Sequence, residues 1–353
     1  MRRAPRRTGF TLVELLVVIA IIIILMALSL VVVTRIWNKV DDSRTVVEIS
    51  SLAEKLLLFK RDFGRFPPSR LMLCERGATY NAQISAGNQL AVESVEFLTA
   101  IFPGINLTAP VAPRGFDGNS SPQTGIGHDW AGRFGVNGFF SGVVPPLATP
   151  QTYILEGQEV LVYFLGGMRY GDLTGQPNAS SRTPARGFST NKALPCAMPP
   201  IGGNSQRLGP YFEFQEDRIN YSSFNQPARR WNAIPNGSAP AGIGYFPVYL
   251  DRFDTPYAYF AARAGTQNNY LPIDCAHLMG VPFRPYFQTE TVVGPSTVTV
   301  YHKPDTFQII SAGRDQQFGS GGRYDPKNPE AGLTNSADYD NITNVSGGTI
   351  VPK

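Results

Sequence analysis

One carboxylate, Glu14, lies inside an otherwise uncharged and largely apolar stretch that runs from Phe10 to Val33. A carboxylate at this depth in a membrane helix costs on the order of 3 kcal/mol, so we expect it to have a cationic partner. The nearest such cation is the free amine that a cut just before Phe10 would create. Within one helix that amine points away from Glu14, so the pairing is expected between neighbouring copies of the chain.

The stretch 10–33 is long enough to cross a bilayer, because at about 1.5 Å per residue it spans roughly 36 Å against a hydrocarbon core of about 30 Å. Arginines precede it at positions 2, 3, 6 and 7. The positive-inside bias therefore predicts a cytoplasmic N-terminus and a C-terminal domain outside the cytoplasm. A signal peptide is the common alternative, but its apolar core is only about 7–15 residues long, and no small-x-small cleavage site follows here.

Residues 9–14 read Gly-Phe-Thr-Leu-Val-Glu and follow a short basic leader. This order resembles the class III signal of type IV pilins and of the pseudopilins of type II secretion. In that family a membrane prepilin peptidase cuts after the glycine and methylates the new N-terminal amine, and the glutamate pairs with the N-terminus of an adjacent subunit. The resemblance implies cleavage between Gly9 and Phe10, an N-methylated Phe10, and Glu14 as the assembly charge.

Composition and charge bound the rest of the chain. The 353 residues include 35 Gly and 29 Pro, and 42% are hydrophobic, which favours a loop-rich, β-containing exterior domain over a helical bundle. The net charge of +4 comes from 31 Lys and Arg against 27 Asp and Glu, and four of the arginines lie in the leader. The processed chain is therefore close to neutral, and no nucleic-acid partner is predicted.

The sequence contains no convincing catalytic constellation. The glycine-rich segments 202–205 and 319–322 do not lie between a strand and a helix with a following Lys, as phosphate binding would require. No Gly-x-Ser-x-Gly elbow is present. Cys74, Cys196 and Cys275 are far apart and odd in number, which excludes zinc-type spacing and leaves their pairing open. We predict that the chain is not an enzyme but the substrate of one.

The N-terminal helix is predicted to continue to Phe63, because residues 34–63 contain no Gly or Pro and keep a helical spacing of apolar residues. Charged residues, among them Glu48, are expected largely on other faces. Gly64 and the Pro67-Pro68 pair predict the end of the helix. The apolar stripe consists of Ile36, Val40, Val46, Ile49, Ala53, Leu56 and Phe63, widened by Leu52, Leu57 and Phe59.

Beyond the helix, two short helices are predicted over 92–101 and 158–165, within a long loop-rich region. Strand signals concentrate in the last third of the chain, over 209–214, 244–250, 257–262, 298–301 and 306–311. The predicted fold class is α+β: a long N-terminal helix, its first half transmembrane, packed on a C-terminal antiparallel β-sheet. The expected parts are a leader (1–9), an assembly helix (10–33), an amphipathic helix half (34–63), a loop-rich insertion (64–243) and a β-sheet region (244–353).

A second resemblance lies in the last third. Residues 251–259 resemble the Asp-Pro-Trp-Gly-x-Pro-Tyr-x-Tyr turn and strand of the major, G-type pseudopilins, with Phe253 and Asp254 in place of Trp and Gly. Residues 307–315 resemble the strand that leads into the C-terminal calcium loop of those proteins. That loop closes on an aspartate-rich segment, here 338–344.

The resemblance implies a calcium site. Calcium takes about six to eight oxygen ligands, and the side-chain ligands would be Asp315, Asp338, Asp340 and Asn341. Carbonyl groups near Ser311 and from 319–322 would complete the set. The spacing from Asp315 to Asp338 is longer than in the family, and intervening basic residues add positive charge. The alternative is a polar loop stabilised by Asx-turns, without a metal.

The predicted function is that of a structural subunit of a type II secretion pseudopilus or a type IV pilus-like filament. Its expected partners are other pilin-like subunits in a homo- or hetero-polymer, the prepilin peptidase and an inner-membrane assembly platform. One alternative is a binding or adhesion module that acts through the insertion 64–243. Another is a membrane-anchored exterior protein that never assembles.

Overall fold

We analysed a computed structural model of the chain. It describes residues 11–108, 130, 152–167, 187–196, 207–220, 246–263, 270–279, 283–330 and 332–351, without the side chains of 27–38 and of positions 220, 277, 279 and 296. The chain divides into two compact units, residues 1–44 and residues 45–353. Each unit is described by itself.

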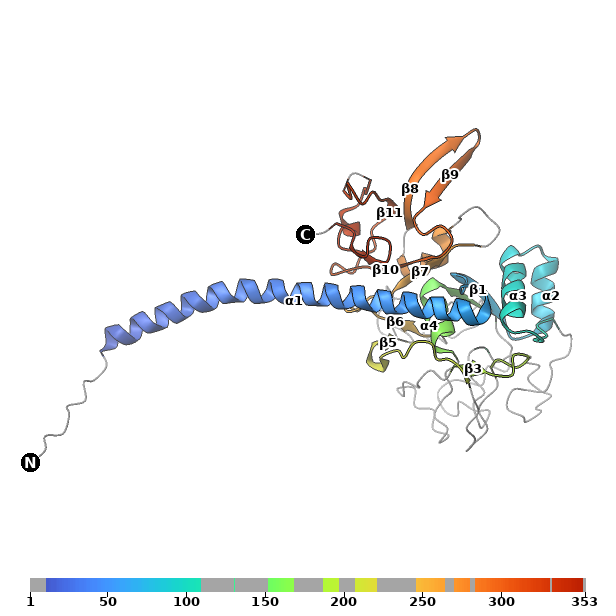
Figure 1. Cartoon of the computed structure of the whole chain (residues 1–353), viewed down its shortest axis with the longest axis horizontal. Helices are drawn as coiled ribbons and strands as arrows, with labels where there is room; N and C mark the ends of the chain where they lie inside the picture. The colour runs from blue at the N-terminus through green and yellow to red at the C-terminus, as the bar shows by residue number, and fades with distance from the viewer. Residues whose placement is uncertain are drawn as a thin grey trace, which may run out of the picture. The chain divides into compact units, whose positions relative to one another are not determined.

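The elements follow one another from a long N-terminal helix to a strand-rich C-terminal part (Figure 1). The helices are α1 (Leu12–Phe63), α2 (Gly77–Ser85), α3 (Gln89–Ile101), α4 (Gly157–Gly166) and α5 (Ala276–Met279), with short 3-10 helices η1 (Glu216–Arg218), η2 (Pro272–Cys275) and η3 (Ser336–Asp338). The strands are β1 (Arg70–Cys74), β2 (Thr152–Glu156), β3 (Phe188–Ser189), β4 (Arg207–Leu208), β5 (Ile219–Asn220), β6 (Val248–Tyr249), β7 (Ala258–Ala261), β8 (Arg284–Val293), β9 (Ser296–Tyr301), β10 (Phe307–Ser311), β11 (Gly321–Arg323), β12 (Ile342–Thr343) and β13 (Gly348–Thr349).

Helix α1 is continuous from Leu12 to Phe63, which agrees with the absence of Gly and Pro from this stretch. It ends where the sequence predicts. Gly64 takes a positive φ of 79°, and its N–H donates to the carbonyl of Lys60 over 2.7 Å, as in a glycine-terminated helix. Among the described residues, no helix combines the length and apolar character that a membrane crossing needs. The predicted transmembrane half, 10–33, is therefore unconfirmed.

The second part of α1 packs into the larger unit through a buried stripe formed by Ile49, Leu52, Leu56 and Phe59. The ring of Phe59 lies edge-on to Phe164 of α4, with 5.8 Å between ring centroids. The predicted stripe is wrong at two positions, because the side chains of Val40 and Leu57 are exposed. Successive helix positions are about 100° apart, so Leu57 is turned away from the buried side on which Leu56 lies, and Val40 precedes Thr45, where the described burial of α1 begins.

Helix α4 is buried along its whole length, from Gly157 to Gly166. Its first turn carries a capping box in which the backbone N–H of Glu156 donates to the carboxylate of Glu159 over 3.0 Å. Glycine is required at 157, since a Cβ there would lie 1.8 Å from the carbonyl oxygen of Tyr259. The helix packs against β2, β6 and β7. The region 64–243, predicted as a loop-rich insertion, thus contributes a helix to the core.

The described strands form small sheets rather than one large one. The four-stranded sheet has the order β13-β12-β10-β7 and is antiparallel. The three-stranded sheet has the order β11-β8-β9, in which β11 runs parallel to β8 and β9 antiparallel to it. Two-stranded antiparallel pairs are β1–β2, β3–β4 and β5–β6. The architecture is mixed α+β with an N-terminal helix and mainly antiparallel sheets, as predicted at that level.

The predicted elements differ in outcome. Helices α3 and α4 and strands β7, β9 and β10 form where the sequence indicates them. The segment 209–214 is not a strand. The N–H groups of Tyr211 and Phe212 both donate to the carbonyl of Leu165, so this segment closes the end of α4 instead of joining a sheet. Strands β1, β2 and β8 and helix α2 were not predicted.

Candidate functional site

The described part of the chain begins at Thr11, so the expected cleavage residues Gly9 and Phe10 lie outside it. Thr11 and Glu14 form a capping box at the start of α1. The backbone N–H of Glu14 donates to Oγ1 of Thr11 over 3.2 Å, and the backbone N–H of Thr11 donates to Oε2 of Glu14 over 2.9 Å. The Thr11 hydroxyl also donates to Oε2, over 2.8 Å. Glu14 therefore has a local structural role that the sequence analysis did not anticipate.

The helix that follows is apolar and uncovered. Every side chain from Thr11 to Met26 is exposed, and the exposed fraction is 79% for Leu12 and 67% for Met26. A helix that presents aliphatic side chains in all directions is typically buried in a larger apolar body. Within the described residues, this chain supplies no such cover. A helix of this composition is suited to apolar surroundings.

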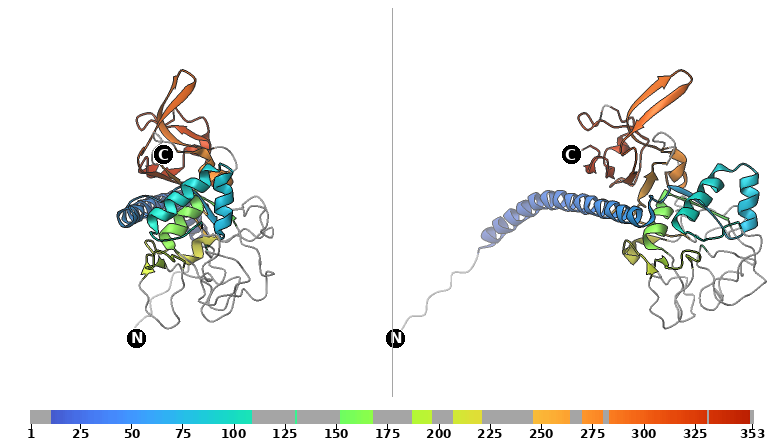
Figure 2. Two further views of the ribbon diagram at one scale, coloured as in Figure 1. Left: turned by 90° about the vertical axis from the view of Figure 1, so that its right-hand side faces the viewer. Right: turned by 45° about the vertical axis from the view of Figure 1, so that its right-hand side comes forward.

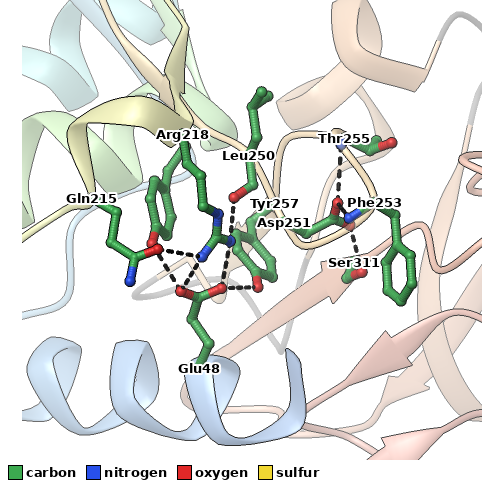
Figure 3. A network of polar contacts seen from close by, with 10 residues as sticks. Glu48, Gln215, Arg218, Leu250, Asp251, Phe253, Thr255, Tyr257 and Ser311 are labelled. Carbon is green, nitrogen blue, oxygen red and sulfur yellow. Dashed lines mark hydrogen bonds and ion pairs between the residues drawn. The ribbon is translucent and has the colours of Figure 1, made fainter. Parts of the chain in front are cut away.

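In the larger unit, one ion pair fixes α1 to Arg218 of η1, and β6 and the segment after it join the same cluster (Figure 3). The guanidinium of Arg218 donates to both carboxylate oxygens of Glu48, each over 2.6 Å. The hydroxyls of Tyr249 and Tyr257 donate to the same carboxylate over 2.8 and 2.5 Å. Arg218 also donates to the carbonyl of Leu250. The pair is bidentate, and both terminal nitrogens of Arg218 are hydrogen-bonded, which helps to make a buried ion pair tolerable.

The electrostatics of this cluster follow from its burial, since the Arg218 and Glu48 side chains are only 10% and 11% exposed. Burial raises the pKa of Glu48, but the hydrogen bonds from Arg218 and Tyr257 and the arginine charge outweigh it, so the net pKa is lowered. For Arg218, burial lowers the pKa, while the bonds and charge of Glu48 raise it above its ordinary value. Both groups therefore stay charged near neutral pH.

The prediction that Glu48 lies on a face other than the apolar stripe is wrong, since its side chain is only 11% exposed. Glu48 lies three residues after the buried Thr45 and four before the buried Leu52, so it falls on the core side of α1. A carboxylate within an apolar stripe was the available signal. Its partner Arg218 could not be identified, because it comes from 170 residues away.

A comparison with known protein families identifies the N-terminal segment. Residues 5–30 match the model of the prokaryotic N-terminal methylation motif. This chain therefore carries the N-terminal segment of the type IV pilin and pseudopilin family. The motif marks it as a prepilin-peptidase substrate of pilin type. No curated protein and no solved structure matches the chain.

The turn that resembled G-type pseudopilins has a defined geometry. The carboxylate of Asp251 accepts the N–H groups of Phe253 and Thr255 over 2.8 and 2.9 Å and the hydroxyl of Ser311 over 2.6 Å. Asp254, which replaces the glycine of that motif, has a positive φ of 62°. Aspartate tolerates this left-handed conformation better than most residues, so the backbone keeps a shape that glycine would also adopt. The G-type assignment itself is not confirmed.

The expected calcium residues lie around one C-terminal loop, and several of their carboxylate oxygens accept backbone N–H groups. Asp338 accepts the N–H of Gly321 over 2.8 Å on Oδ1 and that of Ser320 over 3.0 Å on Oδ2. Burial raises the pKa of Asp338, and these bonds only partly oppose it. Asp340 uses Oδ2 to accept the N–H groups of Arg314 and Asp315 over 2.8 and 3.1 Å.

The other two expected calcium ligands are Asp315 and Asn341. Asp315 accepts the N–H of Gln317 over 2.8 Å. Asn341 donates through Nδ2 to the Tyr286 hydroxyl and to the carbonyl of Phe318, and its buried Oδ1 has no hydrogen-bond partner among the described residues. Within the described residues, no group of three or more His, Cys, Asp or Glu is placed to hold a metal ion. Carboxylate-to-backbone bonds close this loop, as the metal-free alternative predicts, and the calcium site itself stays a prediction.

The three cysteines, whose pairing the sequence left open, are separate buried thiols in this structure. Desolvation raises the pKa of Cys74 to about 12, so this thiol stays protonated and unreactive near neutral pH.

We predict that Asp251 makes stability depend on pH. Burial raises its pKa from 3.8 to about 6. Because folding disfavours the charged form, the free energy of unfolding should fall by up to about 3 kcal/mol as the pH rises from about 4 to about 6. Urea unfolding of the wild type and of Asp251→Asn across this range measures the effect as the difference between the two curves. The exposed neighbour Asp254→Asn is the control and should keep the wild-type profile; parallel curves for wild type and Asp251→Asn contradict the prediction.

We predict that calcium does not stabilise the fold. Millimolar calcium and excess chelator should give melting temperatures that agree within about 1 °C, whereas a ligand present at about 100 times its Kd would add about 2.7 kcal/mol. Thermal unfolding followed by circular dichroism, with magnesium as the control cation, is the measurement. A calcium-specific rise that disappears in Asp338→Asn would show that the loop rearranges into a metal site.

Proposed function

We propose that this protein is a structural subunit of a pilus-like filament, either a type II secretion pseudopilus or a type IV pilus. The observation that carries the proposal is the methylation motif over residues 5–30, followed by a helix whose side chains are exposed and apolar as far as Met26. An uncovered apolar helix of this kind is suited to burial against copies of itself. The role is structural rather than catalytic.

The proposed maturation follows from the motif. Prepilin peptidase cuts between Gly9 and Phe10 and methylates the new N-terminal amine of Phe10. Before assembly the chain is held in the inner membrane by 10–33, with the basic leader cytoplasmic and the larger unit on the periplasmic side. An assembly platform in that membrane then adds it to a homo- or hetero-polymer of pilin-like subunits.

The proposed assembly contact uses Glu14. Both contacts that Thr11 makes with its carboxylate involve Oε2. Within the described part of the chain, Oε1 makes no hydrogen bond, so one oxygen is available while the capping box stays intact. We assign this oxygen to the N-terminal amine of an adjacent subunit. The same group then caps its own helix and binds its neighbour.

We predict that the mature chain begins at N-methylated Phe10. The intact mass of the protein purified from membranes should equal that of residues 10–353 plus one methyl group, and N-terminal sequencing should begin with methyl-phenylalanine. Gly9→Val, which blocks the expected cleavage by its bulk, is the comparison and should retain Met1. A wild-type chain that keeps its leader in the membrane would overturn the proposal.

We predict that the charge of Glu14, and not only its capping role, is needed for assembly. Glutamine can replace glutamate in a capping box, whereas alanine cannot. Both Glu14→Gln and Glu14→Ala should therefore lose filaments, and N-terminal analysis should confirm that both are still processed. Sheared filaments counted by electron microscopy provide the measurement. Normal filaments from Glu14→Gln alone would reduce the residue to a helix cap and contradict the charge pairing.

A further inference from the structure

The hairpin β8–β9 is the most exposed β element in the described structure. Figures 1 and 2 show it extending away from the other strands of the larger unit. Its strands pair in register from Thr289 opposite Val300 to Val293 opposite Ser296, beyond a bulge next to Phe287. They are joined by Gly294-Pro295, with a positive φ of 63° at Gly294, as a tight two-residue hairpin loop requires.

The two faces of this hairpin differ in chemistry. Directly opposite residues share a face, so the pairing places Thr289, Thr291, Val293, Ser296, Val298 and Val300 together. We call this set the uncharged face. All of its residues except Ser296 are β-branched, and the exposed fractions are 59% for Val293, 43% for Val298 and 41% for Val300.

The opposite face carries the charge of the hairpin. Glu290 accepts from Arg284 and from the Thr299 hydroxyl, the latter over 3.1 Å. The cation and the anion therefore satisfy each other on that side. Val292, which is 73% exposed, shares that side with Glu290, whereas the uncharged face carries no charged residue.

The outer strand β9 also lacks the usual protection of a sheet edge. Proteins commonly protect such edges with lysine, proline or a bulge within the strand, because unpaired N–H and C=O groups invite another chain. The sequence of β9 is Ser-Thr-Val-Thr-Val-Tyr, with no charged residue and no proline. Strand β11 pairs with β8 only as far as Phe287, so the outer part of the hairpin is a two-stranded ribbon, which is marginally stable in water by itself. These features indicate that the hairpin is covered when the protein is in its working state.

We propose that the uncharged face of β8–β9 docks on the larger unit of a second copy of this chain in the filament. This inference rests on the proposed function, because polymerisation through the N-terminal segment keeps copies of the chain side by side. Contacts in which Glu14 of one copy meets the N-terminus of the next repeat head to tail, so the hairpin meets a different surface of its neighbour rather than another hairpin. The neutrality of the face excludes attraction to nucleic acid or to anionic lipid headgroups as the source of binding.

Photocrosslinking in intact filaments tests this contact. A photoreactive amino acid is placed at 298, on the uncharged face, or at 297, which lies one residue away and on the opposite face. Position 298 should yield a covalent dimer of this chain severalfold more efficiently than position 297. Crosslinks from 298 to another protein or to lipid, or equal dimer yields from both positions, would overturn the proposal.

A pair of charge variants provides the second measurement. Val298→Lys should reduce the yield of filaments severalfold, while Thr297→Lys should leave it near the wild-type level. The melting temperature of the detergent-solubilised subunit should be the same for both. Equal losses from the two variants, or unchanged filaments from Val298→Lys, contradict a docking face.

The controls separate this inference from the proposed function. Filaments built from methylated subunits that do not crosslink through position 298 refute the hairpin contact and leave the filament role intact. A chain that retains Met1 and forms no filaments refutes the filament role, and the hairpin contact with it.

Discussion

The carboxylate of Glu48 is the point at which the second part of α1 is held in the larger unit. It receives both terminal nitrogens of Arg218 and the hydroxyls of Tyr249 and Tyr257, so four hydrogen bonds converge on one side chain. Removing either partner of such a pair would leave a buried charge without compensation, which typically costs about 3–5 kcal/mol. Apolar packing of Leu52 and Leu56 attaches the helix, and the polar cluster determines its register, because only one rotation brings Glu48 to the arginine.

The same constraint links the helix to the part of the chain that resembles G-type pseudopilins. Tyr257 donates to Glu48, and Tyr259 donates to the carbonyl of Pro67, over 2.7 Å, just beyond the end of α1. The two tyrosines of the motif thus bond to the helix and to the segment that leaves it. Asp251, in the turn before them, stabilises that turn by accepting the N–H groups of Phe253 and Thr255. The motif predicts a turn and a strand, and in this structure it also binds the N-terminal helix.

The N-terminal part of α1 presents the opposite situation, since its aliphatic side chains have no cover within the described residues. Glu14 caps its own helix there through Oε2, which accepts both bonds from Thr11. The proposed assembly contact therefore uses the other carboxylate oxygen, Oε1. In the C-terminal loop, the carboxylates of Asp338 and Asp340 likewise accept backbone N–H groups.

The family motif that includes residues 9–14 could be recognised from the sequence because it is short and contiguous. The long helix was predictable from the absence of Gly and Pro, and its end from the conformational freedom of Gly64. Strands β7 and β10 were also predictable, since β-branched and aromatic runs indicate strands. Strand β8 was not, because Pro285 and a polar run disguise it. The burial of Glu48 and the donors around Asp338 were decided only by tertiary structure. Their partners lie up to 209 residues away, and no local pattern encodes a contact between distant segments of the chain.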